Sequence, residues 1–226
     1  MSSFDIGSGT GRGAERKAAA AHVDQSSREL AGNLPGLVDP RIRSDLLSSD
    51  PAVVDRGLVA LCQSLKDRQE LPAGYLVPLA TAAASTYWQH LDQGLEDLAL
   101  ANRRAAARLL ELYPATQVVE ALLGIYAEQK KPEGKALLLQ DIFDQVSKRG
   151  AQIPEAALNT ICQETAGLDA ESLRKMDNHG GLENLLRLLE QIGRRPELLI
   201  SDGGGQFSTD NALVMLTAKQ IELGRS

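Results

Sequence analysis

Helix formation is easiest to recognise in residues 50–65, which read DPAVVDRGLVALCQSL. Asp50 is a residue type that accepts hydrogen bonds from the first free N–H groups of a helix, and Pro51 suits the first helical position. Apolar residues then recur at intervals of three and four, at Val54, Leu58, Leu61, Cys62 and Leu65. This stretch therefore predicts a helix over 51–67 with one buried face.

Similar helical patterns follow one another along the chain, and short breaks rich in Pro, Gly and Asp separate them. The predicted helices cover 41–47, 51–67, 75–90, 95–112, 115–129, 135–149, 154–166, 170–177, 182–192 and 211–223. Asp169 is predicted to cap one of them, and 130–134 is predicted to be a turn. No convincing strand is found, so the sequence predicts an all-α fold of about nine or ten helices.

Composition also favours helices over sheets. Aromatic residues make up only 4% of the 226 residues, whereas the helix formers Ala, Leu, Gln, Glu and Arg are abundant. Residues 1–40 differ from the rest, because Gly, Ser and Ala dominate there and large apolar side chains are few. We therefore expect a flexible leader at 1–40 and a single all-α domain at 41–226.

The spacing of the helices suggests a repeat. The pairs are 51–67 with 75–90, 95–112 with 115–129, and 135–149 with 154–166, at a step of about 40 residues. Two helices also begin alike, with PAVV at 51–54 and PATQVV at 114–119. In these features the chain resembles HEAT and armadillo repeat proteins over about 40–190. The resemblance implies antiparallel helix pairs stacked as a short solenoid, and an irregular helical bundle is the alternative.

The charge pattern argues against nucleic acid as a partner. Thirty acidic residues outnumber 24 basic ones, the net charge is −6, and no long block of like charges occurs. A phosphate backbone requires clustered Lys and Arg, so nucleic acid binding is not expected. Charges of both signs alternate along one predicted helix, and we expect them on its solvent side; they are Glu96, Asp97, Arg103, Arg104 and Arg108.

Hydropathy and cysteine usage suggest the cytoplasm. No run of about 18 apolar residues occurs, so no membrane span is expected. The N-terminus lacks the apolar core of a secretory signal peptide. Cys62 and Cys162 are the only cysteines, and each lies in an apolar helical pattern. We expect two buried, reduced thiols and a reducing compartment.

Recognisable motifs for cofactors and metals are missing from the sequence. The stretch GSGTGRGA at 7–14 is rich in glycine, but its glycines do not match the register of a nucleotide-binding loop. The histidines, His22, His90 and His179, are far apart, and no partner stands at metal-ligand spacing. The sequence thus predicts no cofactor, no metal ligand and no assigned catalytic residue.

The aromatic residues are unevenly distributed. Every Tyr and the only Trp lie between 75 and 126, at Tyr75, Tyr87, Trp88, Tyr113 and Tyr126. Aromatic side chains are common anchors in protein interfaces, although they also fill cores. We therefore predict a partner-binding surface in this region, with Tyr87 or Trp88 at its edge.

The function predicted from these features is a non-enzymatic adaptor or scaffold that binds another protein through a helical surface. One alternative is a subunit of a larger assembly, such as a bacterial secretion apparatus. Another is a secreted effector enzyme with Cys162 as nucleophile and His179 as base, oriented by Asp177 or Asn178.

Overall fold

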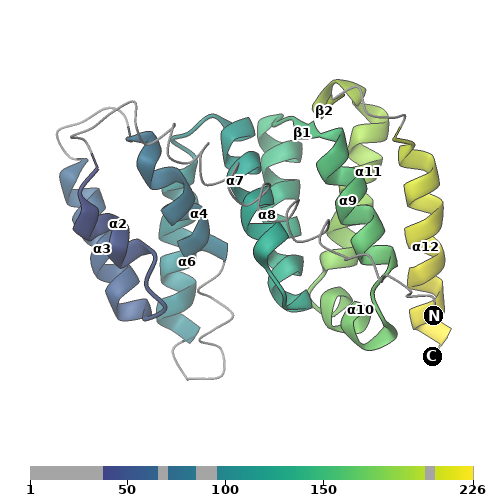
Figure 1. The fold of residues 1–226 in the computed structure, drawn as a ribbon, viewed down its shortest axis with the longest axis horizontal. Helices are drawn as coiled ribbons and strands as arrows, with labels where there is room; N and C mark the ends of the chain where they lie inside the picture. Colours follow the sequence, from purple (N-terminus) through teal and green to yellow (C-terminus); the bar gives the residue numbers. More distant parts are fainter. Residues whose placement is uncertain (1–37, 66–70, 85–95, 202–206, 226) are drawn as a thin grey trace, which may run out of the picture. The chain divides into compact units, whose positions relative to one another are not determined.

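Residues 38–65, 71–84, 96–201 and 207–225 are described by the computed structural model, and helices dominate these ranges (Figure 1). The α-helices of the described ranges are α2 (Pro40–Leu46), α3 (Pro51–Ser64), α4 (Leu76–Ala84), α6 (Glu96–Leu110), α7 (Ala115–Glu128), α8 (Pro132–Arg149), α9 (Glu155–Ala166), α10 (Ala170–Asp177), α11 (Gly181–Arg194) and α12 (Thr209–Arg225). Two short 3-10 helices, η1 (Ala73–Tyr75) and η3 (Pro196–Leu198), lie between them. The predicted all-α class is confirmed.

Acidic caps begin two helices where the sequence predicts them. Asp50 Oδ1 accepts a hydrogen bond from the N–H of Ala52 at 2.9 Å, and Pro51 is the first residue of α3. Asp169 accepts a hydrogen bond from the N–H of Ser172 at 2.8 Å at the start of α10. Each cap supplies an acceptor to an N–H group that has none within its helix.

Helix α8 begins earlier than the sequence pattern suggests. The segment 130–134 was expected to be a turn, but α8 starts at Pro132 and continues to Arg149. Proline fits this position because the first N–H groups of a helix need no intrahelical acceptor. The helix ends at Gly150, whose φ of 66° lies in the left-handed region that glycine adopts without strain.

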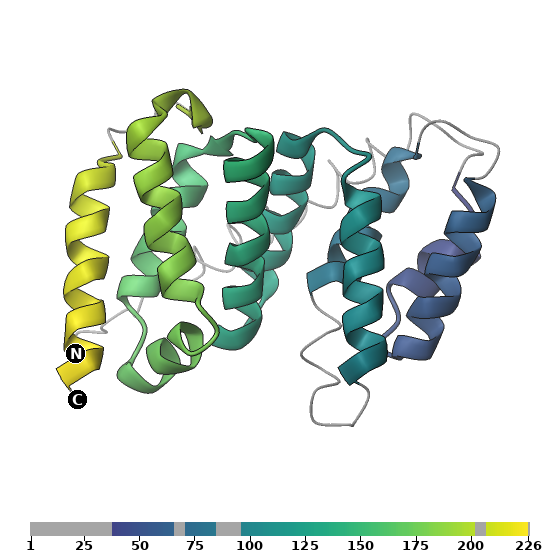
Figure 2. The same ribbon diagram turned by 180° about the vertical axis from the view of Figure 1, so that it is seen from behind.

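The helices pack mainly on helices that lie near them in the sequence. Helix α2 packs on α3, α3 on α6, and α4 on both α6 and α7. Helix α7 packs on α8, α8 on α11, and α12 on both α9 and α11. Figures 1 and 2 show this order, with α2 and α3 at one end and α12 at the other. The predicted pairs were α3 with α4, α6 with α7, and α8 with α9, and this pairing is wrong: among the described residues α4 packs instead on α6 and α7, α7 on α8, and α9 on α12. The resemblance to HEAT and armadillo proteins stays a prediction.

The core is continuous through these contacts, and α8 lies near its middle. Leu138, Leu139 and Ile142 of α8 are fully buried. At the first residue of α11, Gly181 allows close approach to α8, because an added Cβ would lie 2.8 Å from the Cβ of Ala136. The backbone at the start of α11 therefore lies directly against Ala136 of α8.

A very short parallel sheet corrects the prediction that the chain has no strand. Strand β1 (Ile153–Pro154) pairs with β2 (Leu199–Ile200), and Ile153 lies opposite Leu199. Two residues are too few to produce a detectable alternation of apolar and polar side chains. The pair joins the segment before α9 to the segment after α11.

Residues Val38–Ser226 form one compact unit. The predicted leader, 1–40, lies outside the described residues except for its last three positions, and Pro40 already begins α2. Within the described ranges, no helix combines the length and the apolar character that crossing a bilayer requires.

Candidate functional site

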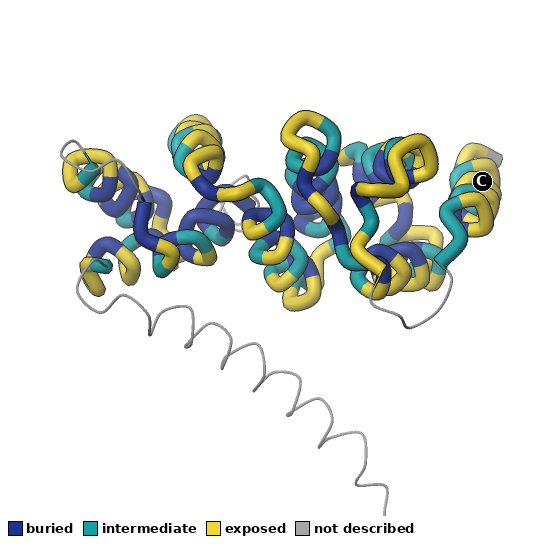
Figure 3. The backbone as a smooth tube through the Cα atoms, turned by 90° about the horizontal axis from the view of Figure 1, so that it is seen from above, coloured by how far each residue is buried: buried dark blue, intermediate teal, exposed yellow. Residues whose placement is uncertain are grey.

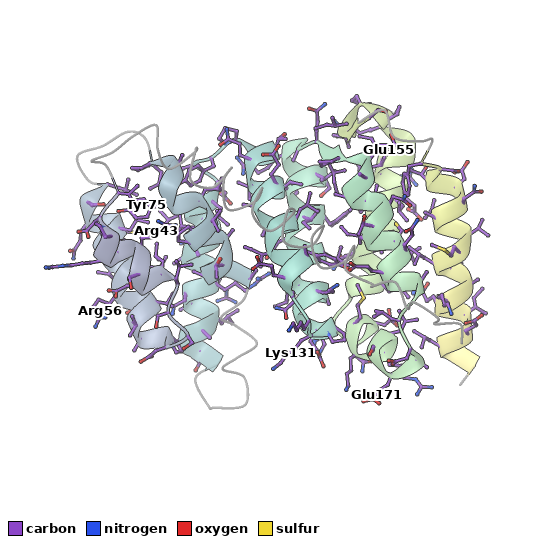
Figure 4. The ribbon with its side chains drawn as sticks, viewed as in Figure 1. Arg43, Arg56, Tyr75, Lys131, Glu155 and Glu171 are labelled. Atoms are coloured by element: carbon purple, nitrogen blue, oxygen red, sulfur yellow. The ribbon has the colours of Figure 1, made fainter. Side chains whose placement is uncertain are left out.

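Three of the five aromatic residues predicted to bind a partner lie in the core. Tyr75, Tyr113 and Tyr126 are at most 5% exposed. The Tyr75 hydroxyl (Figure 4) accepts a hydrogen bond from the N–H of Asp39 at 2.6 Å, and the Tyr113 hydroxyl donates one to the carbonyl of Pro72 at 2.7 Å. The prediction of a surface role is corrected for these three, because their rings fill the core, and the hydroxyls of Tyr75 and Tyr113 bond to backbone groups.

Charged neighbours cover the ring of Tyr126. Lys135 Nζ lies 4.6 Å from the centroid of this ring and 2.6 Å from Glu164 Oε2. Burial raises the pKa of the Tyr126 hydroxyl. The aromatic face that a partner would need is thus occupied by a cation within the same chain.

Tyr87 and Trp88 lie outside the described residues. The prediction that one of them stands at the edge of a partner-binding surface stays a prediction.

The nucleophile of the enzyme hypothesis is a buried thiol. Cys162 lies within α9 and is 1% exposed. Burial raises the pKa of this thiol to about 12, so the reactive thiolate is scarce at neutral pH. His179 lies on the exposed turn that follows α10. These observations favour a core packing role for Cys162 over attack on a substrate.

Cys62 is exposed, and this corrects the prediction of two buried thiols. The buried side chains of α3 include Leu58 and Leu61, on the side that packs against α2 and α6. Cys62 follows Leu61 directly, and one residue turns the helix by about 100°, which carries its side chain to the solvent side. The apolar stripe predicted from the sequence was therefore one residue too wide.

Sequence reasoning did not find a partly buried ion pair, whose two side chains are 14% and 22% exposed. Arg103 binds Asp141 through two hydrogen bonds, 2.6 Å from Nη2 to Oδ1 and 3.0 Å from Nη1 to Oδ2, and Nη1 also donates to the carbonyl of Ala83 at 2.6 Å. The contacts join α6 to α8 and α4. Burial raises the pKa of Asp141 to about 6, and the charge of Arg103 offsets part of that rise. Arg103 is thus a cross-link within the stack, and its predicted place on the solvent side is wrong.

Exposed apolar side chains gather on the outer side of α12. Val214 is 72% exposed, Ile221 50% and Met215 37%. Ala218 is also exposed, and Val214, Ala218 and Ile221 follow one another at intervals of four and three residues, so they share one side of the helix. We call Val214, Met215, Ala218 and Ile221 the outer face of α12.

The inner side of α12 fixes the direction of the outer face. Ala212 and Leu216 are buried where α12 packs on α9 and α11. Just before α12, the N–H of Phe207 donates a hydrogen bond of 2.6 Å to Glu155, the first residue of α9 (Figure 4). Because these contacts lie on one side and at one end, the rest of the helix is open to solvent, as the exposed stretches of its tube show (Figure 3).

Other large apolar side chains on the described surface are exposed one at a time. They are Leu47, Val59, Val77, Leu112 and Ile200, each on a different segment. Isolated exposed apolar residues are ordinary on protein surfaces, whereas several on one helix face mark interaction sites. The outer face of α12 is therefore the candidate functional site.

A signal for this face was present in the sequence. Residues 212–216 read ALVML, five apolar residues in succession. Five consecutive residues point to every side of a helix, so one neighbouring layer cannot cover all of them. The same residues also predict the helix over 211–223, and the excess of apolar side chains predicts that part of it stays exposed.

No group of three or more His, Cys, Asp or Glu side chains is placed to hold a metal ion in the part of the chain that the structure describes. Comparison with models of protein families, with curated proteins and with solved structures finds no match to this chain. The candidate site therefore rests on its own geometry.

Proposed function

We propose that the protein is a non-enzymatic adaptor or scaffold that binds another protein through the outer face of α12. The observation that carries the proposal is the exposure of Val214 and Ile221, at 72% and 50%, on the same side of one helix. A partner that covers these side chains removes apolar surface from water, which is the main driving force of protein association.

The outer face has the composition of an interface centre with a polar edge. Burial of a side chain such as Val or Ile contributes on the order of 1–3 kcal/mol. Exposed polar residues, among them Asp210, Thr217 and Glu222, surround the apolar ones. Such an edge provides hydrogen bonds and orients the partner. Recognition would then depend on shape and burial, without a cofactor or turnover.

A lipid surface fits this helix less well than a protein does. Helices that lie on membranes carry many Lys and Arg residues on their polar side. The sequence of α12 contains two acidic residues, Asp210 and Glu222, and two basic ones, Lys219 and Arg225. A balanced charge offers no attraction to anionic lipids.

Free thiols at Cys62 and Cys162 support a reducing compartment such as the cytoplasm.

Photo-crosslinking from position 214 in the native host tests the proposal. The full chain would carry a photoreactive phenylalanine analogue at Val214 or, as a matched control, at Val59 of α3, which is 48% exposed and isolated. We expect a crosslinked protein at 214 that is not seen at 59 and that disappears with Ile221→Glu. Equal amounts of the same crosslinked protein at positions 214 and 59 would refute the proposal. The mass of the crosslinked species identifies the bound protein and so distinguishes a single adaptor partner from a subunit of a larger assembly.

A further inference from the structure

We propose that the contact between α6 and α8 is a joint within the fold, at which the helices up to α6 move relative to those from α7 onward, and that Arg103 holds this joint closed. The inference does not depend on the outer face of α12, because it concerns another part of the stack. Three observations support it: which helices pack on one another, where two arginines bridge α6 and α8, and which side chains α4 buries.

The helix contacts of the described residues divide the stack into two groups. Helices α2, α3, α4 and α6 pack among themselves, and so do the helices from α7 to α12. Between the groups, only α4 packs closely on the second group, namely on α7 and α8, whereas the backbones of α6 and α8 barely meet. Figures 1 and 2 show the two groups one after the other along the stack. A single helix therefore provides the close packing that joins the groups.

Two arginines bridge α6 and α8 where the backbones do not pack. Arg103 of α6 binds Asp141 of α8 through two hydrogen bonds, of 2.6 and 3.0 Å. Nη2 of Arg149, the last residue of α8, donates to the carbonyls of Glu111 and Tyr113, just after α6, at 3.0 and 2.7 Å. On both segments the two bridges are about two helical turns apart, roughly 12 Å. The two helices thus run side by side in the same direction.

The two bridges hold different parts of the joint. Arg149 binds the loop 111–114, which connects the two groups along the chain and stays in place when they move. Arg103 lies about 12 Å from that loop. It also donates to the carbonyl of Ala83 at 2.6 Å, in the last turn of α4, where carbonyls have no donor within their helix. Rotation about the loop separates Arg103 from Asp141 first, so the loop is the pivot and Arg103 is the latch.

The close packing between the groups permits this movement. Most of the buried residues of α4 are alanines, namely Ala80, Ala82, Ala83 and Ala84. Short side chains interlock little with a neighbouring helix, so α4 can slide by a small shear and stay buried. The latch opposes the slide, because an arginine that binds a carboxylate through two hydrogen bonds requires one relative position of the two helices. A partner that touches both groups would select the angle between them that fits it best.

Pulsed electron paramagnetic resonance on the full chain measures the joint directly. In a Cys62→Ser background, spin labels on Val59→Cys of α3 and Glu120→Cys of α7 report a distance across the joint. Labels on Glu120→Cys and Glu190→Cys of α11 report a distance within the second group. All three labelled positions are exposed. We expect Arg103→Met to widen the distribution of distances between 59 and 120 about twofold, as a released hinge or shear contact would, and to leave that between 120 and 190 unchanged.

Two further variants make the result specific to the latch. Arg104→Met is the matched control, because Arg104 is the next residue of α6 and is exposed, and it should change neither distribution. Loss of Arg103 alone leaves the carboxylate of Asp141 without its cation and can prevent folding. Arg103→Met combined with Asp141→Leu removes both charges, and we expect the same widening from it. Unaltered helical circular dichroism verifies that each variant is folded.

Two outcomes would overturn the inference. An unchanged distribution between 59 and 120 in a folded variant means that Arg103 only stabilises a rigid contact. Equal widening of both distributions means that the whole chain has loosened and that no joint exists. Neither outcome bears on crosslinking from position 214, so failure of the joint is distinguishable from failure of the adaptor proposal.

Discussion

Helices α8 and α12 have almost the same length, 18 and 17 residues, and opposite surroundings. Helix α8 packs on α7, α10 and α11, whereas α12 packs on α9 and α11. Apolar side chains point to more than one side of each helix, but only α8 has neighbours on more than one side to cover them. The difference shows that the position of a helix in the stack decides what happens to its excess apolar surface. In the middle of the stack neighbouring helices bury this surface, whereas at the end of the stack part of it stays exposed and can bind a partner.

The largest expected effect is the difference in unfolding free energy between a substitution in α8 and one on the outer face of α12. Leu139→Ala in α8 removes a fully buried side chain and leaves a cavity, which should lower the free energy of unfolding by about 2–5 kcal/mol. Val214→Ala on the outer face of α12 should change it by at most about 0.5 kcal/mol. Urea unfolding followed by circular dichroism measures both. Equal losses would mean that the outer face is covered in the folded monomer.

A second prediction concerns the pH dependence of the centre of the stack. Since burial raises the pKa of Asp141 to about 6, the folded protein keeps a proton that the unfolded chain releases at lower pH. Ionisation of Asp141 therefore costs stability as pH rises from about 4 to 6, by about 3 kcal/mol at most. Asp141→Asn cannot titrate, so the stability of the wild type relative to this variant should fall over that window.

Urea unfolding of both proteins at several pH values provides the measurement. The control is the same type of substitution at an exposed carboxylate, Asp97→Asn. The stability of the wild type relative to this control should not fall between pH 4 and 6. If the relative stability of the wild type rises between pH 4 and 6, the two hydrogen bonds from Arg103 outweigh burial and hold the carboxylate ionised.

The smallest expected effect tests whether α12 opens separately from α8. Glu155→Ala removes the acceptor of the Phe207 N–H and should destabilise the attachment of α12 by about 1 kcal/mol. Hydrogen exchange should become faster in α12 while the amides of α8 keep their protection. Glu190→Ala, at an exposed position of α11, is the control. Equal acceleration in both helices would show that they unfold together.

Local signals made most of the fold predictable. Asp50 and Asp169 cap helices as predicted, because a cap depends only on a few neighbouring residues. The start of α8 was missed because proline ends a helix as readily as it begins one, and only the neighbours decide between the two.

Surface and burial were harder to predict, because they depend on distant residues. The partner of Arg103 lies 38 residues away and that of Tyr113 41 residues away, so no local pattern indicates that either side chain is buried. The prediction that Cys62 is buried was wrong for the opposite reason, because the helices that cover α3 leave the edge of its apolar stripe open. The outer face of α12 was predictable in principle from the run at 212–216.

Packing between helices that are near in sequence has a consequence for the order of folding. Contacts between consecutive helices, such as α7 with α8 and α10 with α11, require only short loops to close, whereas α8 meets α11 only after α9 and α10 have been passed. We expect α12 to open first, because its packing is confined to α9 and α11 on one side. A partner that covers the outer face would supply the missing neighbour and suppress this fraying, so binding and completion of folding become the same event at this end of the chain.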